Sequence, residues 1–136
     1  MSYIPAKLKL QVEQRAAGRC EYCHLSQAGQ EARFHVDRVS PSSAGGVTAI
    51  ENLCLACVSC SLRKGARTHA ADPETGTTVP LFNPRQHTWG HHFVWNGCIA
   101  EGITSTGRAT IAALAMNRPL VIEIRREEQL LGRHPL

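Results

Sequence analysis

Apolar residues recur at a spacing of four near the start of the chain, at Leu8, Val12 and Ala16. This spacing is typical of a helix that buries one face. Pro5 suits the first turn of such a helix, because proline has a fixed φ, and Gly18 suits its end. We therefore predict a helix from Pro5 to the residue before Gly18.

A shorter, alternating pattern follows further along the chain. Phe34 and Val36 are separated by one polar residue within residues 33–40, which predicts a short strand. Residues 41–46 (PSSAGG) consist of turn-forming residues and predict a turn. A helix is predicted after the second pair of cysteines, and Gly65 is expected to stop it.

The second half of the chain has a more irregular pattern. Residues 66–90 are polar and rich in Pro, Gly, Thr and His, and we expect a long arm there. Apolar residues 93–95 and 99–100 flank Asn96-Gly97, which is the strongest short signal for a β-hairpin.

Two helices are predicted after this hairpin. Residues 107–116 (GRATIAALAM) form the first, and the second has Asn117 as its N-cap with Pro119 just inside it. The second helix carries an apolar stripe, formed by Leu120, Ile124 and Leu131. Helices mixed with short strands predict an α+β fold, which we expect to form a single domain over residues 1–136.

Composition narrows the class of protein. The chain has 136 residues, of which 43% are hydrophobic, so it is long enough for one core and does not resemble a disordered chain. It has no apolar run long enough to cross a bilayer, and its first residues lack the features of a secretory signal. We expect a cytoplasmic protein with reduced thiols, in which paired cysteines usually bind metal.

Charge adds a weaker indication. The formal net charge is +4, and twelve of the fifteen basic residues are arginine, whose planar side chain can grip phosphate oxygens through two hydrogen bonds. This composition suits a nucleic-acid partner, although many soluble proteins share it.

Four of the six cysteines form two Cys-x-x-Cys pairs, Cys20/Cys23 and Cys57/Cys60, with 33 residues between the pairs. Zn²⁺ prefers four thiolate or imidazole ligands in a tetrahedron, and each pair supplies two sulfurs from one tight turn. A disulfide and a redox dithiol are the alternatives, but a redox motif needs only one pair in a βαβ context. We predict one structural zinc ion, and expect Cys54 and Cys98 to be small buried residues outside the site.

The segment between and after these pairs resembles the HNH endonuclease family. The resemblance rests on four stretches: Asp37-Arg38-Val39-Ser40-Pro41, Gly45-Gly46, Asn52-Leu53 and Ala56-Cys57-Val58-Ser59-Cys60-Ser61-Leu62-Arg63-Lys64-Gly65. Flanking stretches, at residues 19–23, 72–76, 81–85 and 106–110, are similar to one bacterial branch of the family.

The resemblance implies a ββα-metal core over residues 19–67, with the arm, hairpin and C-terminal helices in residues 68–136. It also implies hydrolysis of DNA phosphodiester bonds with a divalent ion, Mg²⁺ or Mn²⁺, bound by hard oxygen ligands. Asp37 matches the family's acidic ligand. Asn52 matches the asparagine that braces the hairpin loop. Its alternative role is that of a turn residue that caps a following helix, and the two roles are compatible. We expect DNA as the partner and no small-molecule cofactor.

Two positions depart from the family pattern. Arg38 stands where the family has its general-base histidine, and a guanidinium stays protonated and cannot accept a proton from water. Ser61 stands where a longer asparagine or histidine ligand is usual. His35 offers a replacement base. It lies two residues before Asp37, and side chains two residues apart on a strand point to the same face of the sheet. A histidine that only packs beside the zinc site is the alternative.

These departures leave two functions open, a weak or inactivated HNH endonuclease and a DNA-binding pseudonuclease. A zinc-stabilised protein-interaction module is a third interpretation. Arg63, Lys64 and Arg67 cluster near the end of the second cysteine helix, and we expect them to contact the DNA backbone together with Arg38. A solvated basic face is the alternative for each of these residues singly.

Overall fold

A computed structural model describes residues 3–135 and has the predicted α+β character, with four α-helices and three two-stranded sheets within that range. The chain divides into two compact units. The first unit comprises the chain up to Thr68 together with Asn83–His87, and the second comprises His69–Phe82 and the chain from Thr88 onward. The prediction that the chain acts as one domain stays a prediction. No helix in residues 3–135 is long and apolar enough to cross a membrane.

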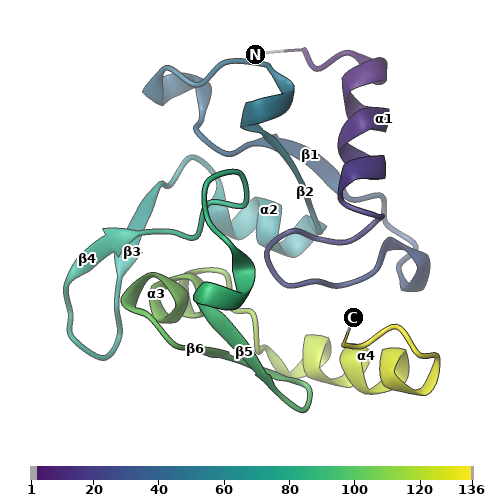
Figure 1. Ribbon diagram of the computed structural model, residues 1–136, viewed down its shortest axis with the longest axis vertical. Helices are drawn as coiled ribbons and strands as arrows, with labels where there is room; N and C mark the ends of the chain where they lie inside the picture. The colour runs from purple at the N-terminus through teal and green to yellow at the C-terminus, as the bar shows by residue number, and fades with distance from the viewer. Residues whose placement is uncertain (1–2, 136) are drawn as a thin grey trace. The chain divides into compact units, whose positions relative to one another are not determined.

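The first unit begins with helix α1 (Ala6–Arg15), close to its predicted bounds. Pro5 precedes the helix, and Ala17 and Gly18, with φ of 53° and 69°, end it in the left-handed conformation. Val12 is the fully buried residue of α1, and Figure 1 shows the helix lying beside the hairpin of β1 and β2.

Strands β1 (His35–Arg38) and β2 (Leu53–Ala56) pair antiparallel, with His35 opposite Ala56 and Arg38 opposite Leu53. All four residues of β2 are buried, so this strand supplies the centre of the unit's core. Helix α2 (Val58–Lys64) follows β2 after one residue and ends at Gly65, as predicted. Two strands and a helix therefore form the ββα arrangement that the family resemblance implied.

The second unit contains two hairpins and two helices. Strands β3 (His69–Ala71) and β4 (Thr78–Pro80) pair with each other, and so do β5 (Phe93–Asn96) and β6 (Ile99–Gly102), the predicted Asn-Gly hairpin. Helix α3 (Ser105–Ala113) packs closely on β6 (Figure 1). A Cβ atom at Gly107 would lie 2.1 Å from the carbonyl oxygen of His92, so only glycine permits this approach.

Three sequence predictions differ from the structure of this unit. Residues 66–90 do not form a plain arm, because they contain the β3–β4 hairpin. Helix α3 begins at Ser105, since the Thr104 side chain caps it by accepting a hydrogen bond from the N–H of Gly107 at 3.0 Å.

The third difference concerns helix α4 (Pro119–Leu130), whose N-cap is Arg118 and not Asn117. The Asn117 side chain pairs with the backbone of Ala100 instead, accepting from its N–H at 2.8 Å and donating to its carbonyl at 2.7 Å. These two bonds tie the start of α4 to strand β6.

Candidate functional site

The four cysteines of the two Cys-x-x-Cys pairs lie together in the first unit. All are buried, and their sulfur atoms lie within 4.8 Å of one another. The sulfurs of Cys23 and Cys57 are 3.7 Å apart. A tetrahedron with Zn–S bonds of about 2.3 Å has edges of about 3.8 Å, so the cluster fits a four-coordinate metal ion such as zinc.

Local backbone structure prepares both pairs. The N–H groups of Cys23 and Cys60 point at the sulfurs of Cys20 and Cys57, at 3.5 and 3.4 Å. His24 turns the chain after the first pair with a φ of 65°, and Cys57 is the N-cap of α2. Amide groups aimed at sulfur favour the thiolate form that binds a metal ion.

The two other cysteines lie outside this cluster, as predicted. Cys54 is buried on β2, 3.7 Å from the hydroxyl of Tyr22, and burial raises the pKa of its thiol to about 12. Cys98 is half-buried in the second unit. No disulfide joins any of the six cysteines, all of which lie within the described residues.

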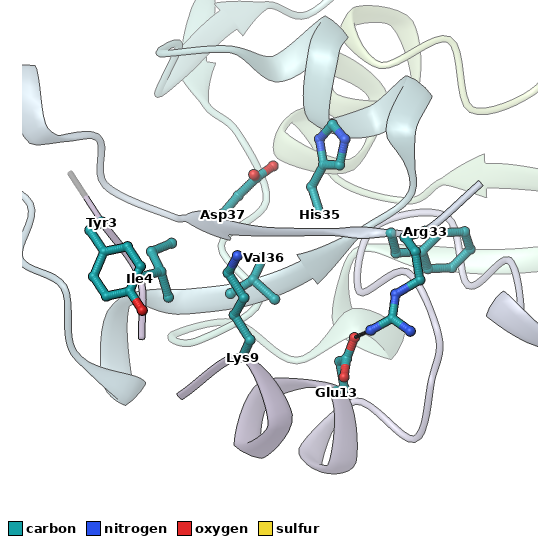
Figure 2. Close-up of a pocket in the computed structure, with 9 residues that line it drawn as sticks. Tyr3, Ile4, Lys9, Glu13, Arg33, His35, Val36 and Asp37 are labelled. Carbon is teal, nitrogen blue, oxygen red and sulfur yellow. Dashed lines mark hydrogen bonds and ion pairs between the residues drawn. The ribbon is translucent and has the colours of Figure 1, made fainter. Parts of the chain in front are cut away.

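A second group of polar side chains lies on the ββα element itself, on β1 and α2. Figure 2 shows the His35 and Asp37 side chains leaving β1 on the same side of the strand. Nδ1 of His35 lies 2.8 Å from Oγ of Ser61 on α2. Asp37 and Ser61 also line one open hollow of about 250 Å³, which Arg38 borders. The structure thus brings together four residues that the sequence singled out.

Arg38 is held at the edge of this hollow by a residue that the sequence did not single out. Its Nε and one terminal nitrogen donate to Oγ1 of Thr48, at 3.0 and 2.6 Å. Both bonds go to the same hydroxyl oxygen, which fixes the orientation of the guanidinium.

Asn52 closes the loop that joins β1 to β2. Its side-chain oxygen accepts from the N–H of Ser40 at 2.9 Å, and its amide donates to the carbonyls of Ser40 and Val47, at 3.0 and 2.8 Å. The loop is tight at Gly46, where a Cβ atom would lie 1.8 Å from the Ser40 carbonyl oxygen. Strand β2 and not a helix follows Asn52, so the alternative role of capping a following helix does not apply.

The basic cluster at the end of α2 is smaller than predicted. Arg63 and Arg67 are exposed. Lys64 is only 4% exposed, and its ammonium group donates to the carbonyl of Val39 at 3.0 Å. Burial lowers the pKa of Lys64. The prediction that Lys64 contacts DNA is therefore a misassignment, because its side chain fixes α2 to the end of β1 and does not reach the surface.

An ion pair that the sequence did not assign to the site supports the cysteine cluster. Glu21, inside the first pair, forms an ion pair with Arg85 and accepts from the N–H of Leu55 at 2.8 Å. Arg85 belongs to the segment Asn83–His87, which joins the first unit although it is distant in sequence. The only sequence signal for this contact was the family-like stretch at residues 81–85, which indicated no partner.

Comparison with known proteins agrees with this geometry. Residues 20–67 match the family model for the HNH endonuclease. No match was found among curated proteins, and none among solved structures. The matched segment begins at the first cysteine, ends beyond α2 and contains every residue of both groups described above except Arg85.

Proposed function

We propose that this chain, which carries an HNH endonuclease segment at residues 20–67, is a metal-dependent nuclease that hydrolyses DNA phosphodiester bonds. The observation that carries this proposal is the placement of His35 and Asp37 on one side of β1, with His35 Nδ1 2.8 Å from Ser61 on α2. A proton acceptor and hard oxygen ligands on adjacent elements are the groups that phosphodiester hydrolysis requires.

The cysteine cluster has a structural role in this proposal. Cys20, Cys23, Cys57 and Cys60 supply four ligands, so a zinc ion held there has no open position for water or substrate. Closed four-cysteine sites stabilise folds and do not catalyse reactions. Zinc in this site would hold the turn after α1 against the start of α2.

His35 is the proposed general base. An imidazole whose one nitrogen donates a hydrogen bond presents the lone pair of its other nitrogen. With Ser61 as acceptor at Nδ1, Nε2 of His35 is the nitrogen that takes the proton from the attacking water. Arg38 cannot take this role, because its guanidinium stays protonated.

Asp37 and Ser61 are the proposed ligands of the catalytic ion, Mg²⁺ or Mn²⁺. A carboxylate and a hydroxyl are both hard oxygen donors, and both line the hollow beside α2. When bound, such an ion neutralises charge on the scissile phosphate and on the leaving oxygen. Arg38, at the border of the same hollow, is positioned to bind a phosphate oxygen.

A plasmid-nicking assay tests the proposal. Purified protein is incubated with supercoiled plasmid and Mg²⁺ or Mn²⁺, and wild type is compared with Asp37→Ala. Glu31→Ala is the matched control, because Glu31 is an exposed carboxylate of the first unit outside the hollow. We expect nicking by wild type and Glu31→Ala, none by Asp37→Ala, and none with a chelator.

A DNA-binding pseudonuclease is the second candidate, and Arg38 is the observation that favours it. A fixed cation at the family's base position binds phosphate without cleaving it. This function predicts that wild type shifts duplex DNA in a salt-dependent way and never nicks it with either metal ion. Nicking that is lost in Asp37→Ala excludes it.

A further inference from the structure

An open groove of about 610 Å³ lies along β1 in the first unit, next to the proposed catalytic residues. Its walls are β1 and the two residues before it on one side and α1 on the other, with Tyr3 and Ile4 at one end (Figure 2). The volume is within the usual range for ligand sites. His35 and Asp37 line this groove as well, so it adjoins the place where we propose that the phosphodiester is cut.

The outer edge of β1 gives the groove a backbone donor. Among residues 3–135, β1 pairs only with β2. Leu55 is the partner of Val36 in the hairpin. Its N–H donates to the Glu21 carboxylate and its carbonyl accepts from the N–H of Glu21, so both backbone groups of Leu55 point away from β1. Val36 and Leu55 are therefore a non-hydrogen-bonded pair, and the N–H of Val36 faces the outer edge of the strand.

The α1 wall gives the groove a cation. Lys9 is exposed, and Figure 2 shows its ammonium group reaching toward the middle of β1, near Val36. Arg33, at the far end, forms an ion pair with Glu13 at 2.8 Å and is 80% exposed. Of the two groove cations, Arg33 is engaged by a carboxylate, and Lys9 forms no ion pair with any described residue.

From this geometry we infer that the groove holds the DNA strand beside the scissile bond, with Lys9 and the N–H of Val36 binding a neighbouring phosphate. An ammonium group and a backbone N–H are common donors to phosphate oxygens. Such a contact fixes the register of the strand and carries no base specificity. The inference rests on the proposed nuclease function and adds to it the path of the substrate strand.

Lys9→Ala tests this, with Lys7→Ala as its matched control. Both lysines are exposed on α1, but Lys7 does not line the groove. For nicking of a duplex, we expect Lys9→Ala to raise KM about five- to tenfold with kcat unchanged. For Lys9→Ala, the negative slope of log affinity against log salt should become shallower by about 0.9, the value for one phosphate contact. Lys7→Ala should stay within about twofold of wild type.

Duplexes with one neutral methylphosphonate linkage locate the contact. The cleavage site is mapped first, and each phosphate within about three nucleotides of it is then neutralised in turn. At one position wild type should lose at least the factor that Lys9→Ala loses, and the variant should lose much less there, because only the contact to the Val36 N–H remains. Equal behaviour of the two lysine variants, or additive losses at every position, overturns the inference.

The outcomes for the groove and for the nuclease are separate. A wild type that nicks DNA with a KM independent of Lys9 overturns the groove assignment alone. A wild type that does not nick DNA, whether or not it binds, overturns the proposed nuclease function, and the inference falls with it. Thermal unfolding of both variants checks that α1 is intact, and a midpoint equal to that of wild type is expected for substitutions at exposed helix positions.

Discussion

Cys57→Ser is the sharpest test of the cysteine cluster. Cys57 supplies one of the four sulfurs and is also the N-cap of α2, where its sulfur accepts from the N–H of Cys60 at 3.4 Å. Serine is a favoured N-cap residue, so the substitution keeps the cap and removes one thiolate ligand. The cluster, rather than the helix end, is what this change perturbs.

The magnitude follows from comparing two free energies. Binding of structural zinc contributes on the order of 10 kcal/mol, whereas a whole domain is stable by about 5–15 kcal/mol. The sulfurs already lie within 4.8 Å of one another, so little of the binding energy is spent on rearrangement. Loss of zinc should therefore remove most of the stability of the first unit.

Zinc content and thermal unfolding measure this effect. We expect one zinc per chain in wild type and a large fall in the unfolding midpoint on adding a strong chelator. Cys57→Ser should bind little zinc and lose amide-exchange protection in β2 and α2. Cys54→Ser is the control, because Cys54 is equally buried in β2 but lies outside the cluster. It should keep its zinc, and its cost should be about 1–2 kcal/mol.

Two results would refute this reasoning. One is wild-type protein that is folded and free of zinc when purified without chelator. The other is a Cys57→Ser variant with the zinc content and midpoint of Cys54→Ser. Either would mean that the apolar core around β2 is sufficient for the fold.

Three further predictions concern the hollow and the second unit. His35→Ala should lower kcat for nicking by about 10²–10⁴-fold, and His91→Ala, an exposed histidine of the second unit, should leave kcat unchanged. Arg38→His should stay within about tenfold of wild type, because the base is already present; a gain above about a hundredfold would show that wild type lacks one. Asp72 is bound by Arg108 at 3.0 and 2.8 Å, and this guanidinium lowers the pKa of Asp72 to about 2. Since that pKa is depressed, the ionised Asp72 carboxylate stabilises the fold above about pH 4, and this stabilisation is lost as the pH falls to about 2. The difference in unfolding midpoint between wild type and Asp72→Asn should therefore shrink over that range.

Elements with local signals were predictable from the sequence. The start of α1 after Pro5, the stop of α2 at Gly65 and the Asn96-Gly97 hairpin all depend on the conformational preferences of one or two residues. The two Cys-x-x-Cys pairs were also predictable as one site. A tetrahedral metal ion needs four ligands, and each pair supplies two sulfurs from one tight turn.

Features that depend on distant partners were not predictable. Lys64 looked like a surface cation, but its ammonium group reaches the carbonyl of Val39, 25 residues earlier in the chain. Asn117 looked like a cap, but strand β6 takes its side chain. The hairpin in the polar arm depends on Asp72, whose carboxylate binds its own turn at Glu74 and also Arg108 on α3. Such polar side chains carry no periodic signal, so their burial emerges only with the tertiary fold.

The cysteine cluster and the proposed catalytic side chains depend on the same two elements. Cys60 and Ser61 are consecutive on α2, and Ala56, which pairs with His35, directly precedes Cys57. The 2.8 Å contact between His35 and Ser61 therefore depends on how α2 is held against the hairpin. Since a shift of about 1 Å at a catalytic contact can cost about a hundredfold in rate, a rigid attachment is needed. A closed metal site at Cys57 and Cys60, adjacent to the strand partner of His35 and to Ser61, would supply it without a large hydrophobic core, so a short ββα element could position the proposed hydrolytic site.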